Sequence, residues 1–233
     1  MTQLALDFGH RTAHDAADFL VTPSNRDAVM WLDRWPDWPA PALVIHGPRQ
    51  CGKTHLAHVW RARSGARIIA PDEIDDGAAA DVLLGSSRYA VIDGGDEVVG
   101  ERGLMHLYNM AAERGGALLL TAGSPPARWN IALPDLRSRL VAAPAVAVSP
   151  PDDGLIGALL VKIFHDRQLR VGDGVVEFLT KRMERSFEAA GWIADALDRE
   201  ALAAGRSITV PLARQVLVQY EKLSNGERKW TSE

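Results

Sequence analysis

The sequence predicts an α/β protein in which a parallel-sheet domain precedes a smaller, all-helical domain. Short apolar runs of strand length alternate with helical patterns over the first part of the chain, which is typical of a parallel sheet covered by helices on both faces. A glycine-rich turn joins the first of these runs to a helix, as in the βα units of such sheets. Beyond Pro150 and Pro151 only helical patterns follow.

The strand-like runs are apolar and bounded by turn residues, and they lie at 42–45, 67–70, 89–92, 117–120 and 145–148. Continuous apolar runs of this kind predict strands that are buried on both faces. The helical patterns of the second part lie at roughly 152–168, 173–184, 187–204 and 209–223. We therefore expect an α/β domain at 13–149 and a helical domain at 150–224, with short tails at 1–12 and 225–233.

The composition is that of a globular protein with a sizeable core, since 47% of the residues are hydrophobic and 24% are charged. No apolar run approaches the roughly 18 residues of a membrane-spanning helix, and the first residues lack the features of a signal peptide. Cys51 is the only cysteine, so an internal disulfide is excluded and a reducing cytoplasm is expected. A net charge of −4 argues against a broad basic surface for nucleic acid.

The glycine-rich turn has the complete P-loop pattern, Gly-x-x-x-x-Gly-Lys-Thr, between a predicted strand and a predicted helix. In such a loop the backbone N–H groups point at phosphate oxygens, and the following helix adds its positive end to the anion site. The expected cofactor is ATP or ADP with Mg²⁺: Lys53 is expected to reach the β-phosphate and, in ATP, the γ-phosphate, and the Thr54 hydroxyl to bind Mg²⁺. An incidental glycine-rich turn is the alternative. The expected cofactor-binding residues of this segment are Gly47, Pro48, Gln50, Cys51, Gly52, Lys53, Thr54 and His55.

The third strand-like run ends in Asp93. A carboxylate at the end of an apolar strand is the arrangement of a Walker B segment, which holds Mg²⁺ directly or through water. The alternative is an aspartate that only starts the turn before Gly94. Because a P-loop lies upstream at a suitable distance, we expect Asp93 and Thr54 to share the metal ion.

Several segments resemble DnaA, the bacterial replication initiator, and through it the AAA+ family of P-loop proteins. The resemblance covers nearly the whole chain, and its segments are 23–26, 52–58, 133–140, 181–183 and 207–210. It implies a parallel-sheet AAA+ domain followed by a small all-α lid domain. It also implies a sensor 1 role, in contact with the nucleotide, for Thr121 near the end of a strand.

The chain stops soon after Ser224, where DnaA proteins continue into a helix-turn-helix domain that reads DNA. In this respect it is most similar to the Hda branch of the family, which switches DnaA off. Hda proteins also carry an N-terminal motif for the β sliding clamp of DNA polymerase III, and residues 3–8 look like that motif. An edge strand or a terminus that alternates by chance is the alternative. The expected clamp-binding residues are Gln3 as the polar anchor, with Leu4, Leu6 and Phe8 in an apolar pocket.

Arg139 matches the arginine finger of the family. A finger contacts the γ-phosphate on a neighbouring subunit, here ATP bound to DnaA, and stabilises the transition state of hydrolysis. The resemblance therefore implies DnaA as a partner, and assembly into a homodimer or a larger oligomer. Arg137 is the second candidate, and the alternative for both arginines is that they are solvated charges near a helix end.

Two positions depart from the family pattern. Gly94 follows Asp93, where members that hydrolyse ATP efficiently carry a second carboxylate, and glycine can neither polarise water nor accept a proton. Glu188 stands at the lid position that usually carries a sensor 2 arginine, and its charge would repel a γ-phosphate. We therefore expect weak hydrolysis or none at this chain's own site. Asp96 and Glu97 are close to the missing carboxylate in sequence but lie beyond the glycines, and the candidates to replace the arginine are Arg182 and Arg185.

We expect a negative regulator of replication initiation that binds nucleotide, is tethered to the sliding clamp and acts on DnaA through Arg139. Such a protein would contact DNA mainly through the clamp, in the cytoplasm and near the nucleoid. The main alternative is a DnaA-like replication or helicase-loading factor that binds single-stranded DNA, which needs basic residues along an assembled channel. The third hypothesis is a self-contained small NTPase, which would need a carboxylate in place of Gly94 to activate water. The resident nucleotide and the number of protomers stay open.

Overall fold

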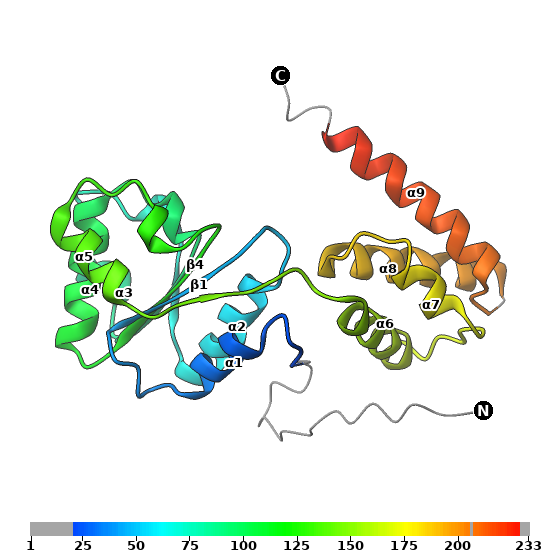
Figure 1. Ribbon diagram of the computed structural model, residues 1–233, viewed down its shortest axis with the longest axis horizontal. Helices are drawn as coiled ribbons and strands as arrows, with labels where there is room; N and C mark the ends of the chain where they lie inside the picture. Colours follow the sequence, from blue (N-terminus) through cyan, green and yellow to red (C-terminus); the bar gives the residue numbers. More distant parts are fainter. Residues whose placement is uncertain (1–20, 206, 229–233) are drawn as a thin grey trace.

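The computed structural model describes residues 21–205 and 207–228. Its first part alternates helices and parallel strands, as the sequence predicts (Figure 1). These elements are α1 (Arg26–Asp33), β1 (Ala42–His46), α2 (Lys53–Ser64), β2 (Arg67–Ile69), α3 (Ala80–Leu84), β3 (Tyr89–Asp93), α4 (Glu101–Glu113), β4 (Ala117–Ala122), α5 (Pro134–Ala142) and β5 (Ala145–Ala147). Three short 3₁₀ helices lie between them, at Pro71–Glu73, Gly95–Glu97 and Pro126–Arg128.

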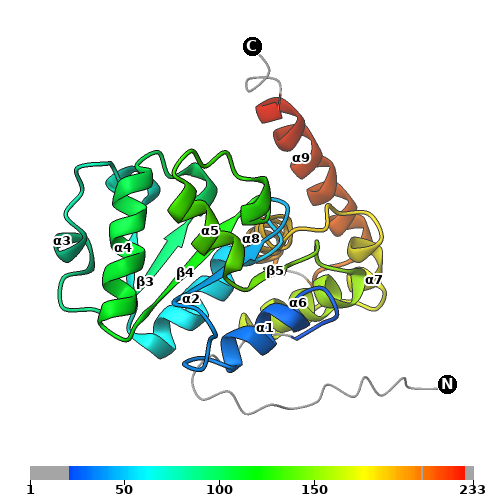
Figure 2. The ribbon, with the colours of Figure 1, turned by 60° about the vertical axis from the view of Figure 1, so that its left-hand side comes forward.

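The five strands form one parallel sheet in the order β2-β3-β4-β1-β5. Alternate residues of each strand face opposite sides: in β1, Val44 packs with residues of α3, α4 and α5, whereas Leu43 and Ile45 pack with residues of α1 and α2. Helices therefore cover both faces of the sheet (Figure 2). Burial on both faces explains why the central strands β1, β3 and β4 are continuous apolar runs. For β2 and β5 the prediction of burial on both faces is wrong, because they lie at the edges of the sheet and are partly exposed. The predicted α/β fold class is confirmed.

The carboxyl ends of three neighbouring strands bring distant parts of the chain together. Asp93, the last residue of β3, pairs in register with Thr121 of β4, and Thr121 pairs with Ile45 of β1. The P-loop begins immediately after β1. In open parallel sheets, ligands bind in the crevice beyond these strand ends. The topology thus places the P-loop, Asp93 and Thr121 at one edge of the sheet.

The second part is helical and consists of α6 (Asp153–Asp166), α7 (Val175–Thr180), α8 (Phe187–Ala204) and α9 (Val210–Arg228). These helices share a hydrophobic core of their own, to which the sheet contributes no residue. Helix α9 continues four residues beyond the predicted end of the helical domain at 224. None of the helices within the described ranges combines the length and hydropathy that a bilayer crossing demands.

Candidate functional site

Two positions of the P-loop, 47 and 52, require glycine because a side chain there would clash or strain the backbone. A Cβ atom at Gly47 would lie 2.2 Å from the carbonyl oxygen of Val148. Gly52 has a φ of 97°, a conformation that residues with a Cβ rarely adopt, and the ring of Phe187 lies against it. The chain can therefore turn sharply between β1 and α2. Helix α2 starts at Lys53, so its positive N-terminal end faces the loop.

Lys53 is held over the loop by backbone carbonyls. Its Nζ donates hydrogen bonds to the carbonyl oxygens of Gly47, at 2.9 Å, and Pro48, at 2.7 Å. The ammonium group thus lies against the first residues of the loop, whose backbone would bind the phosphates of a nucleotide. Cys51 is buried beneath it, and burial raises the pKa of its thiol, an effect that the nearby Lys53 charge opposes. The thiol therefore stays protonated and serves as packing.

Thr54, Asp93 and Thr121 form a hydrogen-bonded group at the strand ends. The Thr54 hydroxyl donates to Asp93 Oδ2 at 2.8 Å, and the Thr121 hydroxyl donates to the other carboxylate oxygen. Thr121 is only 1% exposed, so it lies beneath Asp93 and orients it. Gly94 N donates to the Thr121 hydroxyl at 3.1 Å and completes the support of the carboxylate.

The pairing of Thr54 with Asp93 fits a divalent cation. A hydroxyl and a carboxylate oxygen are hard oxygen ligands of the kind that Mg²⁺ prefers. Within residues 21–205 and 207–228, no three His, Cys, Asp or Glu side chains cluster closely enough to hold a metal ion. An ion at Thr54 and Asp93 would therefore complete its shell with water and phosphate oxygens, as Mg²⁺ usually does in nucleotide sites.

A cavity of about 480 Å³ lies between the P-loop and the lid. Five of the lining residues were predicted to bind the cofactor, whereas those from the segment before α1, those from α6 and Phe187 of α8 were not predicted. The lining residues are Asn25, Gln50, Gly52, Lys53, Thr54, His55, Leu155, Leu159, Lys162, Ile163, Asp166, Phe187 and Glu188. Its size and its apolar walls with a few polar groups are typical of a small-molecule site. The signal for Asn25 was its place in the DnaA-like segment 23–26, whereas the α6 residues resemble any apolar helix face.

The two carboxylates that follow Gly94 point in different directions. Asp96 accepts a hydrogen bond from Gly123 N at 2.8 Å, so it serves the turn after β4. Glu97 folds back, and one of its carboxylate oxygens lies 3.3 Å from the place where a Cβ of Gly94 would be. Of the two, Glu97 is thus the carboxylate that occupies the space beside position 94.

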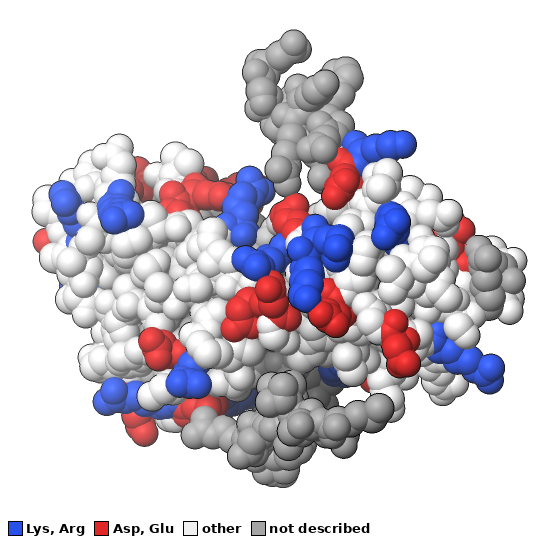
Figure 3. All heavy atoms as spheres, turned by 45° about the vertical axis from the view of Figure 1, so that its right-hand side comes forward, with Lys and Arg blue, Asp and Glu red and all other residues white. Residues whose placement is uncertain are grey.

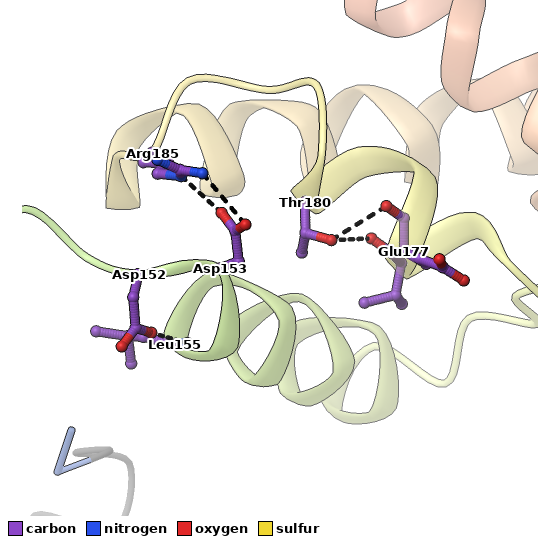
Figure 4. A network of polar contacts seen from close by, with 7 residues as sticks. Asp152, Asp153, Leu155, Glu177, Thr180 and Arg185 are labelled. Carbon is purple, nitrogen blue, oxygen red and sulfur yellow. Dashed lines mark hydrogen bonds and ion pairs between the residues drawn. The ribbon is translucent and has the colours of Figure 1, made fainter. Parts of the chain in front are cut away.

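The lid presents a carboxylate to the P-loop instead of an arginine. Glu188, in the first turn of α8, accepts a hydrogen bond from the Gln50 side chain. Arg185 is bound to Asp153 at the start of α6, with its Nε 2.6 Å from Oδ1 (Figure 4). Arg182 lies over the Phe178 ring, 4.4 Å from its centre. Neither arginine therefore takes the place of a sensor 2 arginine in this structure.

Arg139 lies on a different part of the surface from the cavity. It is exposed in the last turn of α5, and the cavity is lined by the segment before α1, the P-loop, α2, α6 and α8. Its Nη1 donates to Asn109 Oδ1 at 2.8 Å. Arg137, two residues earlier, is also exposed, and the described part of the chain offers its side chain no hydrogen bond, ion pair or ring contact.

One face of the molecule carries charges of both signs. On the face drawn in Figure 3, Lys and Arg side chains lie next to Asp and Glu side chains and form no continuous basic groove. Gln3, Leu4, Leu6 and Phe8 lie outside the described residues.

Comparison with known proteins adds a match in sequence and several in structure. Residues 155–217 match the family model of the lid domain of Hda. The chain resembles domain III of the replication initiation protein DnaA from Thermotoga maritima, with a TM-score of 0.71 and 17% identity over 86% of this chain and 94% of that one. It also resembles AMPPCP-bound DnaA from Aquifex aeolicus, with a TM-score of 0.65 and 15% identity over 89% of this chain and 68% of that one. A mutant of RuvB from Thermotoga maritima gives a TM-score of 0.66 and 14% identity over 83% and 67% of the two chains.

Proposed function

Because the chain combines the AAA+ fold of DnaA with a lid of the Hda type, we propose that it is a negative regulator of replication initiation that promotes ATP hydrolysis on DnaA. The lid match over residues 155–217 is the observation that carries this proposal. The placement of Arg139 supports it, because an exposed guanidinium remote from its own cavity is available to a nucleotide on another protein.

The chain's own cavity holds ATP or ADP with Mg²⁺ in this proposal. The P-loop, the Lys53 ammonium and the paired oxygens of Thr54 and Asp93 are the groups that phosphates and Mg²⁺ need. The similar DnaA structure from Aquifex aeolicus contains AMPPCP. Glu188 adds a negative charge beside Gln50 of the loop, which opposes a third phosphate and favours ADP as the resident nucleotide.

The regulatory function is tested by single-turnover hydrolysis of ATP on DnaA. ATP-loaded DnaA is mixed with the full-length chain, ADP and sliding clamp loaded on DNA, and the loss of ATP is followed in time. We expect clear acceleration over DnaA alone, and less when the clamp is omitted. Hydrolysis at the same rate with and without this chain would rule out the proposed activity.

The N-terminal motif is expected to bind the clamp. Replacing both Leu6 and Phe8 with alanine removes two apolar side chains that fill a pocket in a short linear ligand, so clamp binding should fall below detection in a pull-down or by surface plasmon resonance. The melting temperature should not change. As a matched control, alanine at both Arg11 and Thr12, just beyond the motif, should leave clamp binding intact. Clamp affinity that survives the first pair of substitutions would exclude the motif.

Hydrolysis at the chain's own site is expected to be slow. Gly94 supplies no carboxylate, and Glu188 supplies no positive charge to the phosphates. The steady-state kcat for ATP, measured without DnaA, should lie well below about 1 s⁻¹, the low end of ordinary enzymes. A kcat at or above that value would contradict the expectation. In that case Glu97, which lies beside position 94, would be the carboxylate to replace with glutamine.

A further inference from the structure

Two side chains of α4 hold the exposed guanidinium of Arg139. Asn109 Oδ1 accepts a hydrogen bond from Arg139 Nη1 at 2.8 Å. The aromatic ring of Tyr108 lies beside the same group, with the guanidinium carbon 5.5 Å from the ring centre. A hydrogen bond and a cation–π contact therefore act on one end of a long side chain whose backbone is on α5.

The support behind Arg139 is rigid. Tyr108 is only 5% exposed, and it belongs to the same hydrophobic core as Leu107 of α4 and as Leu136 and Leu140 of α5. Burial raises the pKa of the Tyr108 hydroxyl, and the Arg139 charge opposes this rise. Both helices that contribute to the contact are thus anchored in the core, and the ring has little freedom to move.

Arg137 offers an internal comparison. It lies on the same helix and carries the same charge, yet no residue within the described ranges contacts its side chain through a hydrogen bond, an ion pair or a ring. A solvated arginine loses most of its rotamer freedom when it must be fixed in a complex, whereas one that is already fixed loses less. Both arginines are exposed, but Arg139 differs from Arg137 in having side-chain contacts that fix its guanidinium.

We propose that Asn109, together with the ring of Tyr108, is a positioning residue that holds Arg139 in the orientation in which it reaches a partner's nucleotide. This inference rests on the proposed function, because it assigns these two residues a role in the same reaction. Displacement of a reacting group by about 1 Å can cost on the order of 100-fold in rate. Loss of the Asn109 contact should accordingly lower the rate of the reaction and leave the binding of DnaA unchanged.

The experiment uses two substitutions of nearly the same shape at one position. Asn109→Leu removes the acceptor oxygen, whereas Asn109→Asp keeps it. The full-length variants are titrated into ATP-loaded DnaA with clamp on DNA, and each titration yields a maximal rate and a half-saturating concentration. Asn109→Leu should lower the maximal rate by about 10-fold to 100-fold at an unchanged half-saturating concentration, and Asn109→Asp should restore it to within a few-fold of wild type. His106→Leu, at an exposed position one turn earlier on α4, is the matched control and should behave as wild type.

Three outcomes overturn the inference. An unchanged maximal rate for Asn109→Leu would show that the contact has no part in the reaction. A higher rate would show that Asn109 restrains Arg139 instead of presenting it. A change confined to the half-saturating concentration would make Asn109 a binding residue. The Arg139→Ala variant separates these results from failure of the proposed function. If it stimulates hydrolysis fully, the assignment of Arg139 as the arginine finger is wrong. If it is inactive and Asn109→Leu behaves as wild type, only the positioning role of Asn109 is wrong.

Discussion

Replacement of Arg139 with alanine is expected to abolish almost all stimulation of ATP hydrolysis on DnaA while nucleotide binding and clamp binding persist. An arginine finger raises the rate of hydrolysis by roughly 10³- to 10⁵-fold, which corresponds to about 4–7 kcal/mol of transition-state stabilisation. Arg139 is exposed on α5 and lines no part of the chain's own cavity, so its removal leaves that cavity intact. The substitution should therefore lower only the rate of ATP hydrolysis on DnaA.

The measurement is single-turnover hydrolysis by ATP-loaded DnaA with clamp on DNA, at saturating concentrations of wild type and variant. Arg137→Ala serves as the matched control, because it removes the same charge from the same helix at a position without a supporting contact, and its effect should be much smaller. Calorimetry with ADP and a clamp pull-down verify that the Arg139 variant keeps its other interactions. Full stimulation by Arg139→Ala would refute the mechanism even if every binding result agreed with it.

Replacement of Lys53 with alanine is expected to remove detectable binding of ATP and ADP. Lys53 Nζ lies at the Gly47 and Pro48 carbonyls, where it would donate charge-assisted hydrogen bonds to the phosphates. Each hydrogen bond to a charged group contributes about 1.5–3 kcal/mol, so the loss of two lowers affinity by roughly 100-fold to 10⁴-fold. Isothermal titration calorimetry with Mg²⁺ and either nucleotide checks this result.

A control on the same loop separates this effect from general charge loss. Arg49 is exposed in the P-loop, and Arg49→Ala removes one positive charge without touching the Gly47 and Pro48 carbonyls that hold Lys53. Its nucleotide affinity should stay within a few-fold of wild type. Circular dichroism and a thermal melt establish that both variants are folded. Near-normal affinity in a folded Lys53→Ala protein would disprove the assignment of the P-loop.

Much of the fold could be predicted from the sequence because burial on both faces of a parallel sheet leaves a local pattern. Each of the five apolar runs forms a strand, although β2 and β5 have only three residues each. The end of α9 was predicted too early, since its last turns are polar and apolar periodicity fades there. The sheet order could not be predicted from these patterns, because it depends on pairing between strands that are far apart in the chain.

In the candidate site, too, some residues could be predicted from the sequence and others could not. The P-loop is one contiguous segment, so its residues could be named from sequence alone. The cavity, in contrast, forms only where α6 and α8 pack beside the loop, and Leu155, Ile163 and Phe187 have no local pattern that separates them from other core residues. Arg139 could be predicted from the family resemblance. Its hydrogen bond to Asn109 could not, because it depends on how α5 packs beside α4. The directions of the Asp96 and Arg185 side chains likewise depend on hydrogen-bond partners that are distant in sequence, Gly123 and Asp153.

The hydrogen bond between Gln50 and Glu188 joins the phosphate loop directly to the lid. A nucleotide whose phosphates draw the Gln50 amide toward themselves weakens this bond and so alters the free energy of the lid's orientation. A protein that binds one orientation of the lid must, by thermodynamic linkage, change nucleotide affinity by the same factor in return. The Gln50–Glu188 pair is thus the contact through which a ligand at the loop and a partner at the lid would affect each other's binding.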